Sequence, residues 1–443
     1  MQQDSAYSRR VFMKKGAALA AGMATLRASS YANILGANDR LHVAVVGVHG
    51  RGQALLRAAA NVDKCQIRYI CDVDRQSGEK GVALAVEAGS KKAQLEGDIR
   101  RLLEYKDLDA ILVATPDHWH APMTLMGVQA GKHVYVEKPC SHNPHEGELL
   151  VEAQRKYSRV IQMGNQQRSA PTSMEAIRLI GEGRIGKPYL GKAWYANTRG
   201  PIGKGKPAAV PDWLDYDLWQ GPAPRQPYRD NLIHYNWHWF WHYGTGESCN
   251  NGTHEIDICR WALGVDYPTK VSSSGGRFHY DDDWEFYDTQ TINYEFEGGK
   301  YIVWEGLSCN GQKTMGRDRG ALIIGTEGSI LIDRGGYVLY DKSGKQVQEE
   351  KESGQNATTD ILGIGDMDTF HMRNFAAAIR EGAVQHSPIL EGHKSVLLCH
   401  LGNIAQKTGS TLRTRPSDGY ILDNSEAAAM WRRTYEPGWE MVV

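Results

Sequence analysis

A glycine-rich turn near the start of the chain combines residues that could bind phosphate groups. Residues 41–46 form an apolar run, the sequence G-V-H-G-R-G follows as residues 47–52, and residues 53–61 read as a helix. Gly47 permits a tight turn, and Gly52 allows the helix to approach the strand closely. The free N–H groups and the positive end of the helix dipole would face the two phosphates of a dinucleotide.

An acidic residue follows the second expected strand. Residues 66–71 read as that strand, and it ends at Asp72, twenty residues after Gly52. A carboxylate at this place accepts hydrogen bonds from a ribose diol and repels a 2′-phosphate, so we predict NAD and expect NADP to be disfavoured. His49 replaces the middle glycine of the usual G-x-G-x-x-G motif, and an ordinary strand-to-helix turn is the alternative interpretation.

The same alternation continues along the first part of the chain. Residues 109–114 and 133–136 read as buried strands, with an expected helix over residues 121–130 between them. This pattern predicts an α/β fold with a doubly wound parallel sheet, a Rossmann domain over residues 38–162. Ligands of such sheets bind at the carboxyl ends of the strands, where the sequences T-P-D-H-W-H and E-K-P lie.

Together these motifs resemble those of the Gfo/Idh/MocA oxidoreductases. The shared sequences are G-x-x-G-x-G, C-D-V-D, T-P-D-H-W-H and E-K-P, and the similarity extends from about Asn38 to the end of the chain. The resemblance implies an NAD(P)-dependent enzyme that acts on sugars, cyclitols or their derivatives, and a homodimer or homotetramer. The implied cofactor contacts are Gly47, His49, Gly50, Arg51, Gly52, Asp72, Thr115, Trp119, His120, Glu137, Lys138 and Asn165.

The resemblance also implies the catalytic residues. It places Lys138, from the E-K-P motif, at a substrate hydroxyl as acid and base, with its pKa lowered by burial. A segment expected to be helical from about residue 250 carries Asn250 and His254 on one face. His254 would relay the proton or bind an adjacent hydroxyl, and a core histidine is the alternative. Asn250 stands where the family usually has Asp, and an amide binds a hydroxyl but cannot take a proton.

The remainder of the chain, residues 163–443, changes pattern and reads as an α+β domain. Residues 290–296 and 301–304 alternate with period two around an E-G-G turn, and residues 321–332 read as a second hairpin. We therefore predict an open, mainly antiparallel sheet. Residues 342–359 are polar and read as a surface loop.

An aromatic segment, residues 234–243, precedes the candidate catalytic helix. The segment looks extended, which would place Trp237, Trp239 and Trp241 on one face. Aromatic rings stack on the C–H faces of sugars, and core packing or a subunit interface is the alternative. The chain has no H-E-x-x-H sequence, and His118, of an H-x-H pair, should neighbour the nucleotide or substrate, so we predict no metal site.

Charge and cysteine content exclude several classes of protein. The 443 residues carry 51 Lys and Arg against 52 Asp and Glu, which argues against a protein that coats nucleic acid or binds acidic membranes. The 7 cysteines include no C-x-x-C pair, so neither a disulfide framework nor a zinc ribbon is expected. No run of about 18 apolar residues predicts a membrane span.

Residues 1–32 are expected to form an export signal. The sequence S-R-R-V-F-M-K at residues 8–14, the apolar run 16–26 and a small-residue end resemble a twin-arginine signal peptide. That pathway carries folded proteins, so a periplasmic or otherwise exported protein can carry a cofactor that was loaded in the cytoplasm. A basic amphipathic helix of a cytoplasmic protein is the alternative.

Two classes of function follow from these observations. The first is an exported oxidoreductase that transfers a hydride between a sugar or glycoside hydroxyl and a tightly bound nicotinamide. A variant of it is transient oxidation at C3 followed by elimination, as in glycoside hydrolase family 109, whose Y-P-T-H-like segment this sequence lacks. The second class is a non-catalytic nucleotide-binding scaffold, because a fold alone does not define a function.

Overall fold

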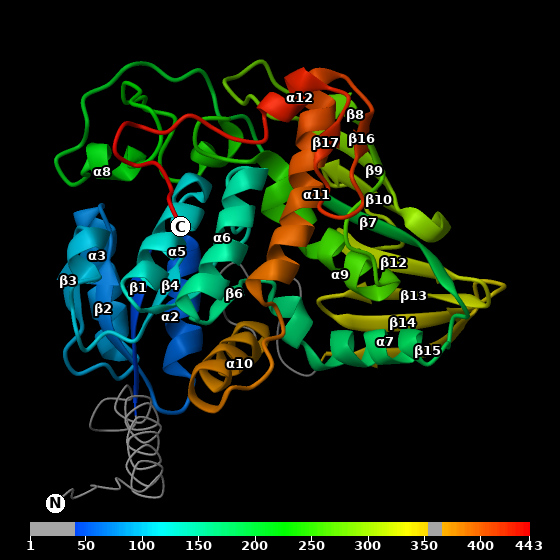
Figure 1. Ribbon diagram of the computed structural model, residues 1–443, viewed down its shortest axis with the longest axis horizontal. Coiled ribbons are helices and arrows are strands. Elements are labelled where there is room, and N and C mark those ends of the chain that lie inside the picture. Colours follow the sequence, from blue (N-terminus) through cyan, green and yellow to red (C-terminus); the bar gives the residue numbers. More distant parts are fainter. Residues whose placement is uncertain (1–39, 353–365) are drawn as a thin grey trace, which may run out of the picture.

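Two β-sheets organise the chain into two domains (Figure 1). The computed structural model describes residues 40–352 and 366–443, so the expected signal segment, residues 1–32, lies outside the described residues. Within the two described stretches, no helix is both long enough and apolar enough to cross a membrane.

The first sheet has six parallel strands in the order β3-β2-β1-β4-β5-β6. Its strands are β1 (Leu41–Val46), β2 (Cys65–Cys71), β3 (Gln94–Glu96), β4 (Ala110–Val113), β5 (His133–Val136) and β6 (Ile161–Met163). The connecting helices are α2 (Gly50–Ala60), α3 (Arg75–Glu87), α4 (Ile99–Leu102), α5 (Asp117–Gln129) and α6 (Pro144–Tyr157). The central strands are apolar because both of their faces are buried. The predicted Rossmann fold with its doubly wound parallel sheet is confirmed.

The second sheet has eleven strands and is mainly antiparallel. Its strands are β7 (Pro188–Thr198), β8 (Lys270–Gly276), β9 (Thr289–Glu295), β10 (Tyr301–Leu307), β11 (Cys309–Asn310), β12 (Arg319–Gly325), β13 (Gly328–Asp333), β14 (Gly336–Asp341), β15 (Gln346–Lys351), β16 (Leu412–Thr414) and β17 (Ile421–Leu422). The two predicted hairpins are β9–β10 and β12–β13, and only β7 and β10 pair in parallel among the described strands of this sheet. This confirms the predicted open α+β architecture.

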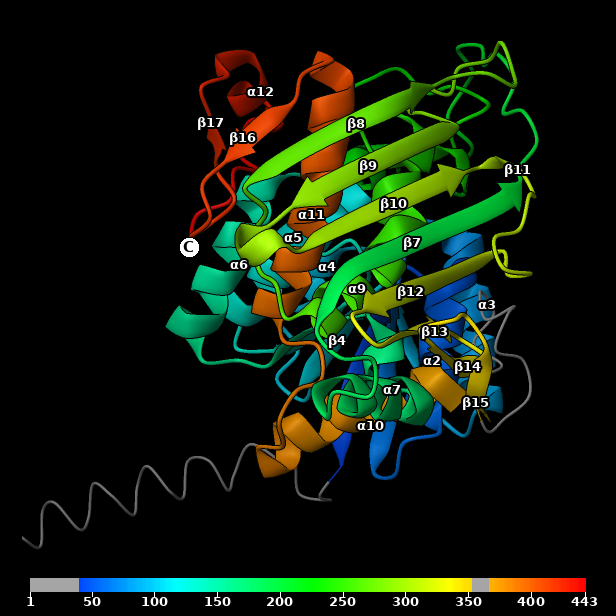
Figure 2. The same ribbon diagram turned by 90° about the vertical axis from the view of Figure 1, so that its right-hand side faces the viewer.

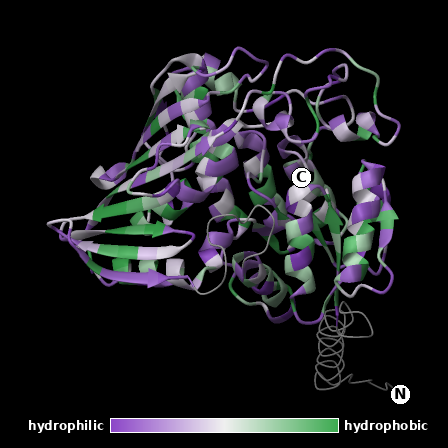
Figure 3. Ribbon diagram, turned by 180° about the vertical axis from the view of Figure 1, so that it is seen from behind, coloured by the Kyte–Doolittle hydropathy of each residue, from purple (hydrophilic) through white to green (hydrophobic). Residues whose placement is uncertain are grey.

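Helices pack against one face of the second sheet, and the other face is open (Figure 2). The helices around it are α7 (Pro171–Gly181), α9 (Thr253–Leu263), α11 (Ile389–Thr408) and α12 (Ser425–Ala429), whereas α8 (Tyr216–Gln220) lies over the first domain, where Trp219 O contacts His118 and Trp119 of α5 (Figure 1). Ile256 of α9 and Leu398 of α11 share a buried core with Ile292 and Trp304 of the sheet. Apolar residues accordingly follow the strands, and polar residues follow the outer helices and loops (Figure 3).

One helix returns from the second domain to the first. Helix α10 (Asp366–Glu381) places Met372 and Phe375 in a hydrophobic core with Leu41 of β1 and Leu55 of α2. The core of the Rossmann domain is therefore completed by a segment that follows the second sheet's central strands in sequence.

Two local predictions are wrong. Residues 234–243 are not extended, because Asn236–Trp239 form a short 3₁₀ helix. The polar segment 342–359 contains a strand, Gln346–Lys351, at the edge of the second sheet, and its residues beyond 352 lie outside the described part of the chain. An exposed edge strand needs no apolar face, so its sequence resembles that of a loop.

Candidate active site

A cavity of about 570 Å³ is lined by residues of both domains at the carboxyl ends of the Rossmann strands. This volume lies in the range of small-molecule sites. The predicted site residues that line it are Gly47, His49, Gly50, Arg51, Asp72, Thr115, Trp119, His120, Glu137, Lys138, Asn250 and His254. The fold thus brings the predicted cofactor residues and the predicted catalytic residues to one cavity.

The glycine turn leaves no room for side chains at two positions. Gly47 has a φ of +79°, and a Cβ there would lie 2.8 Å from the Ala114 carbonyl oxygen. A Cβ on Gly52 would lie 1.8 Å from the Gly47 carbonyl oxygen, so Gly52 supports the turn from behind the cavity wall. His49 caps α2 without a side-chain hydrogen bond, which leaves the first N–H groups of the helix for a ligand. This arrangement fits the pyrophosphate of a dinucleotide.

Asp72 is held at the end of β2 by the main chain. Its carboxylate accepts hydrogen bonds from the N–H of Val48 at 2.7 Å and of Asp74 at 2.9 Å. Burial raises the pKa of Asp72 to about 6, although these two N–H groups oppose the shift. Each carboxylate oxygen has a second lone pair, so Asp72 can also accept a ribose hydroxyl.

A segment of the second domain covers the glycine-turn end of the cavity. The N–H of Arg75 donates to Trp213 O at 2.9 Å, and the N–H of Asp215 donates to Val73 O at 3.0 Å. The ring of His234 stacks on that of predicted site residue His49, with centroids 4.4 Å apart. This cover would restrict the exit of a bound nucleotide.

The sequence did not predict that this segment covers the cavity. His234 makes a second contact with the first domain. Its Nε2 lies 3.0 Å from the Asp74 carboxylate, and both residues line the cavity. The aromatic content of residues 234–243 was the only signal for this contact.

Lys138 lies in the cavity beside Asn250. Its Nζ donates to the main-chain oxygen of Asn250 at 2.6 Å and to the Asn250 side-chain Oδ1 at 3.0 Å. Burial lowers the pKa of Lys138 below its usual range, although the carboxylates of Glu137 and Asp117 oppose this shift. The amine form of Lys138, which can accept a proton, is therefore more accessible than in a solvated lysine.

Asn250 and His254 sit on either side of a change in helix geometry. Asn250 lies in a π-helical turn, Ser248–Gly252, and α9 begins only at Thr253, so the expected helix start at residue 250 is a wider turn. Such turns are frequent at functional sites. In the described part of the chain, neither ring nitrogen of His254 has a hydrogen-bond partner, which leaves both for a ligand.

The charge state of His254 is set by burial and by neighbouring cations. Burial, and after it the charges of Arg334, Arg319 and Lys138, hold the pKa of His254 well below its usual range. The ring is therefore neutral at pH 7, with one nitrogen that donates and one that accepts a hydrogen bond.

Several predicted neighbours of the ligand lie elsewhere. Asn165 is buried outside the cavity lining, and His118 places its Nε2 2.9 Å from Trp219 O rather than at the cavity. Trp239 stacks on Trp284, and Trp241 packs on Phe286, each at 3.9 Å between ring centroids. These tryptophans form core, as the alternative interpretation held, because residues 236–239 are helical and do not present one face.

The aromatic segment still contributes to the cavity, together with charged residues that sequence reasoning missed. Lining residues from the segment are Tyr235, Trp237 and His238. The missed charged residues in the lining include Arg199, Arg319, Arg334 and Asp368. No motif marks them, since each comes from a different strand, loop or helix end.

Arg51 is fixed by two carboxylates. Its Nε donates to Glu137 at 2.8 Å, and its Nη1 donates to Asp368 of α10 at 2.7 Å. These ion pairs connect the glycine turn with the E-K-P motif and with the helix that returns from the second domain. Arg51 therefore orders the wall of the cavity next to Lys138.

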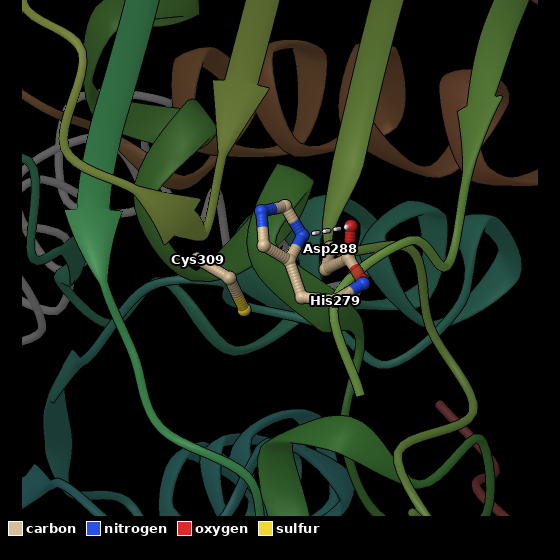
Figure 4. A group of neighbouring side chains, drawn as sticks. All are labelled: His279, Asp288 and Cys309. Atoms are coloured by element: carbon tan, nitrogen blue, oxygen red, sulfur yellow. Dashed lines mark hydrogen bonds and ion pairs between the residues drawn. The ribbon is translucent and has the colours of Figure 1, made fainter. Parts of the chain in front are cut away.

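Among the described residues, one group could supply three metal ligands, and it lies outside the cavity lining. His279, Asp288 and Cys309 approach one another near the ends of the second sheet's strands (Figure 4). The Asp288 carboxylate already accepts hydrogen bonds from the N–H groups of Phe278 and His279. Arg277 Nε lies 3.4 Å from the same carboxylate and would repel a cation. Burial raises the pKa of Cys309 to about 11, so its thiol keeps its proton.

Two family models match the chain. The model described as "Oxidoreductase family, NAD-binding Rossmann fold" matches residues 41–165, and the one described as "Oxidoreductase family, C-terminal alpha/beta domain" matches residues 190–334. Together the matched segments span more than half of the chain. The chain belongs to the Gfo/Idh/MocA oxidoreductase family, which confirms the resemblance of its motifs.

Two curated relatives carry different names. Inositol 2-dehydrogenase 2 of Saccharopolyspora erythraea is 26% identical over 294 residues, which are 66% of this chain and 73% of that protein. A glycosyl hydrolase family 109 protein of the same organism is 28% identical over 214 residues, which are 44% of this chain and 46% of that protein. The chain thus spans less than half of the length of this family 109 relative.

Solved structures share the fold. Levoglucosan dehydrogenase, in a complex with NADH and levoglucosan, has a TM-score of 0.65 at 19% identity, over 84% of this chain and 99% of that chain. The aldose-aldose oxidoreductase from Caulobacter crescentus, complexed with glycerol, has a TM-score of 0.63 at 17% identity, over 84% of this chain and 99% of that chain.

Proposed function

We propose that the protein is an NAD-dependent oxidoreductase that acts on a CH–OH group of a sugar or glycoside. The observation that carries this proposal is the position of Lys138, a half-buried amine in the same cavity as the glycine turn and His254. The relatives named inositol 2-dehydrogenase and levoglucosan dehydrogenase support the carbohydrate class.

Lys138, Asn250 and His254 have different roles in the proposed proton transfer. Bound NAD would supply the hydride acceptor for the carbon that is oxidised. Lys138, in its amine form, takes the proton of the hydroxyl that becomes a carbonyl, and returns it in the reverse direction. The Asn250 amide orients Lys138 through Oδ1 but cannot relay the proton. Neutral His254 binds an adjacent hydroxyl or passes the proton onward.

The first domain supplies the cofactor site in this proposal. The N-terminus of α2 would hold the pyrophosphate, and Asp72 would accept the ribose diol and disfavour the 2′-phosphate of NADP. The cover formed by Trp213, Asp215 and His234 supports a nucleotide that stays bound through many turnovers.

Nucleotide release tests the cofactor assignment directly. The purified protein is denatured, and the released nucleotide is identified by chromatography and ultraviolet absorbance. We expect NAD or NADH in near-equal amount to the protein, and production of NADH when a sugar substrate is added. A protein that carries no nucleotide and shows no calorimetric response to NAD or NADP contradicts the proposal.

A glycosidase that works by transient C3 oxidation is the second candidate. The relatives named glycosyl hydrolase family 109 proteins favour it, and the absence of the sequence Y-P-T-H itself opposes it, since the chain has N-G-T-H at residues 251–254 and Y-P-T-K at residues 267–270. Product analysis with an aryl glycoside separates the two reactions. A keto-sugar supports net oxidation, whereas an unoxidised sugar and free aglycone support net hydrolysis.

We also propose export and self-association. The twin-arginine sequence at residues 8–14 supports export to the periplasm, and replacement of Arg9 and Arg10 by Lys should keep the protein in the cytoplasm. The open face of the second sheet supports a homodimer or homotetramer, which light scattering after gel filtration measures.

A further inference from the structure

Two arginines face each other across a hairpin at the cavity. Arg319 opens β12, and Arg334 directly follows β13. The antiparallel register that pairs Ala321 with Ile332 places Arg319 opposite Arg334 at the ends of the strands. Both line the cavity. Like charges placed directly opposite each other on two strands repel, so this pair needs a compensating anion.

The described residues of the protein compensate one of the two arginines and leave the other without a partner. Arg319 Nε donates to Glu255 Oε1 at 2.7 Å. Arg334 has neither a hydrogen bond nor an ion pair with any residue in the described stretches 40–352 and 366–443. Burial and the charge of Arg319 lower the pKa of Arg334 to about 10, against the opposite influence of Glu255 and Asp368. A guanidinium with five donors thus faces the cavity without an acceptor.

The remaining carboxylates near the pair are already engaged or do not reach it. Asp368 is bound to Arg51, and Glu255 is bound to Arg319. Asp318 also lines the cavity, but it forms no ion pair with either arginine. Since no described residue offers an acceptor to Arg334 at this wall, we assign that role to a ligand.

The arginine pair lies next to the proposed proton-transfer groups. Arg334 and Arg319 are the two cations that most depress the pKa of His254, followed by Lys138. A group bound by the pair would therefore belong to the molecule whose hydroxyl faces Lys138 and His254.

We propose that Arg319 and Arg334 bind an anionic substituent of the substrate, a carboxylate or a phosphate, so that the substrate is an acidic sugar. This inference rests on the proposed function and adds the substrate class to it. The planar guanidinium of Arg334 can give two parallel hydrogen bonds to such a group. A neutral sugar leaves these buried donors unmatched and should bind more weakly.

A substrate panel tests the class. Rates of NADH formation are measured with D-glucuronate, D-galacturonate and D-glucose 6-phosphate, and with neutral D-glucose and D-galactose. We expect kcat/KM to be at least about tenfold higher for acidic sugars than for their neutral counterparts. Higher values for the hexuronates identify a carboxylate, and a higher value for the hexose phosphate identifies a phosphate. Equal or higher values for the neutral sugars overturn the inference, while the proposed function stands.

Variants test the residues. Arg334→Gln should raise KM for the preferred acidic sugar by about 10- to 100-fold, with a smaller change in kcat, and should change KM for the neutral sugar much less. Arg334→Lys keeps the charge and should restore part of the affinity. Arg413→Gln removes an exposed arginine of β16, outside the cavity lining, and should leave KM unchanged. An Arg334→Gln protein with unchanged acid preference overturns the inference.

Calorimetry separates this inference from the proposed function. The nucleotide that we expect to co-purify is removed first, and each nucleotide-free protein is titrated with NAD and then with D-glucuronate or D-glucose 6-phosphate. Loss of acid binding with unchanged NAD binding in Arg334→Gln supports the inference. Loss of NAD binding instead assigns Arg334 to the cofactor and overturns it. If NAD does not bind even to the wild-type protein, the proposed function fails, and binding of the acids alone still decides whether the arginine pair is an anion site.

Discussion

The two ends of the cavity present different kinds of binding group. At the glycine-turn end, main-chain N–H groups and the absence of side chains at Gly47 and Gly52 shape the surface. At the other end, where the second domain meets the first, the groups are the charged or polar side chains of Lys138, His254 and Arg334. The first end depends on backbone geometry that the fold itself fixes. The second can change by single substitutions, so we infer that the fold defines the cofactor and the side chains define the substrate.

The largest expected effect is at Lys138. Lys138→Met removes the proposed base and should lower the rate of oxidation by about 10²- to 10⁴-fold. NAD should still bind, because the backbone of the glycine turn is untouched, and calorimetry measures this. Lys204→Met, at an exposed lysine outside the cavity lining, should leave both quantities unchanged. Full turnover by Lys138→Met would refute the catalytic assignment.

The next largest effect is expected at the glycine-turn end of the cavity. Gly52→Ala places a Cβ 1.8 Å from the Gly47 carbonyl oxygen, so the turn must shift and the free energy of unfolding should fall by about 1–3 kcal/mol. Gly50→Ala is the matched control, because its Cβ would have no other atom within 4 Å. Denaturant unfolding of both variants measures the difference. Equal stabilities would show that this end does not depend on close backbone approach.

A smaller effect is expected in the pH profile of kcat/KM when a residue beside Lys138 is changed. Asn250→Asp puts a carboxylate at the atom that now accepts from Lys138 Nζ at 3.0 Å. An opposite charge raises the pKa of Lys138, so the amine form appears only at higher pH. The rise of kcat/KM for oxidation should therefore move to higher pH by about one unit or more. An unchanged profile would mean that Lys138 is not the group that titrates.

The smallest effect concerns Asp72 and the choice between nucleotides. Its pKa is raised to about 6 by burial, so the carboxylate loses its charge as the pH falls through that value. The ratio of NADP to NAD dissociation constants should then decrease by about fivefold between pH 8 and pH 5, since two charges about 4 Å apart in water interact by ~1 kcal/mol. In Asp72→Asn the part of this change that comes from the carboxylate should vanish, leaving only that from the 2′-phosphate, whose own second pKa is about 6. The same pH dependence in both proteins would contradict the role of Asp72.

The first domain was predictable because its requirements are local. A glycine that must avoid a clash and an acid at the end of a strand occur at a fixed spacing in the sequence, and Gly47, Asp72 and Lys138 do line one cavity. Arg319 and Arg334 have no such spacing. They meet only because a hairpin sets two strand ends side by side, which depends on register rather than on sequence spacing.

The prediction for the aromatic segment, residues 234–243, was wrong for a related reason. Tryptophans pack equally well in a core and around a ligand, so their density predicted a site but not its conformation. Trp237 reached the cavity, whereas Trp239 stacked on Trp284, far away in sequence. Long-range packing of this kind cannot be derived from the pattern of one segment.

The return of α10 to the Rossmann domain has a consequence for the order of synthesis. Met372 and Phe375 cover β1 and α2, yet they leave the ribosome after β1 to β15 have all been made. The first-made half of the chain must therefore wait with an uncovered apolar surface, and a chain that stops before residue 366 cannot close it. The two domains, although each has its own sheet, mature as one unit.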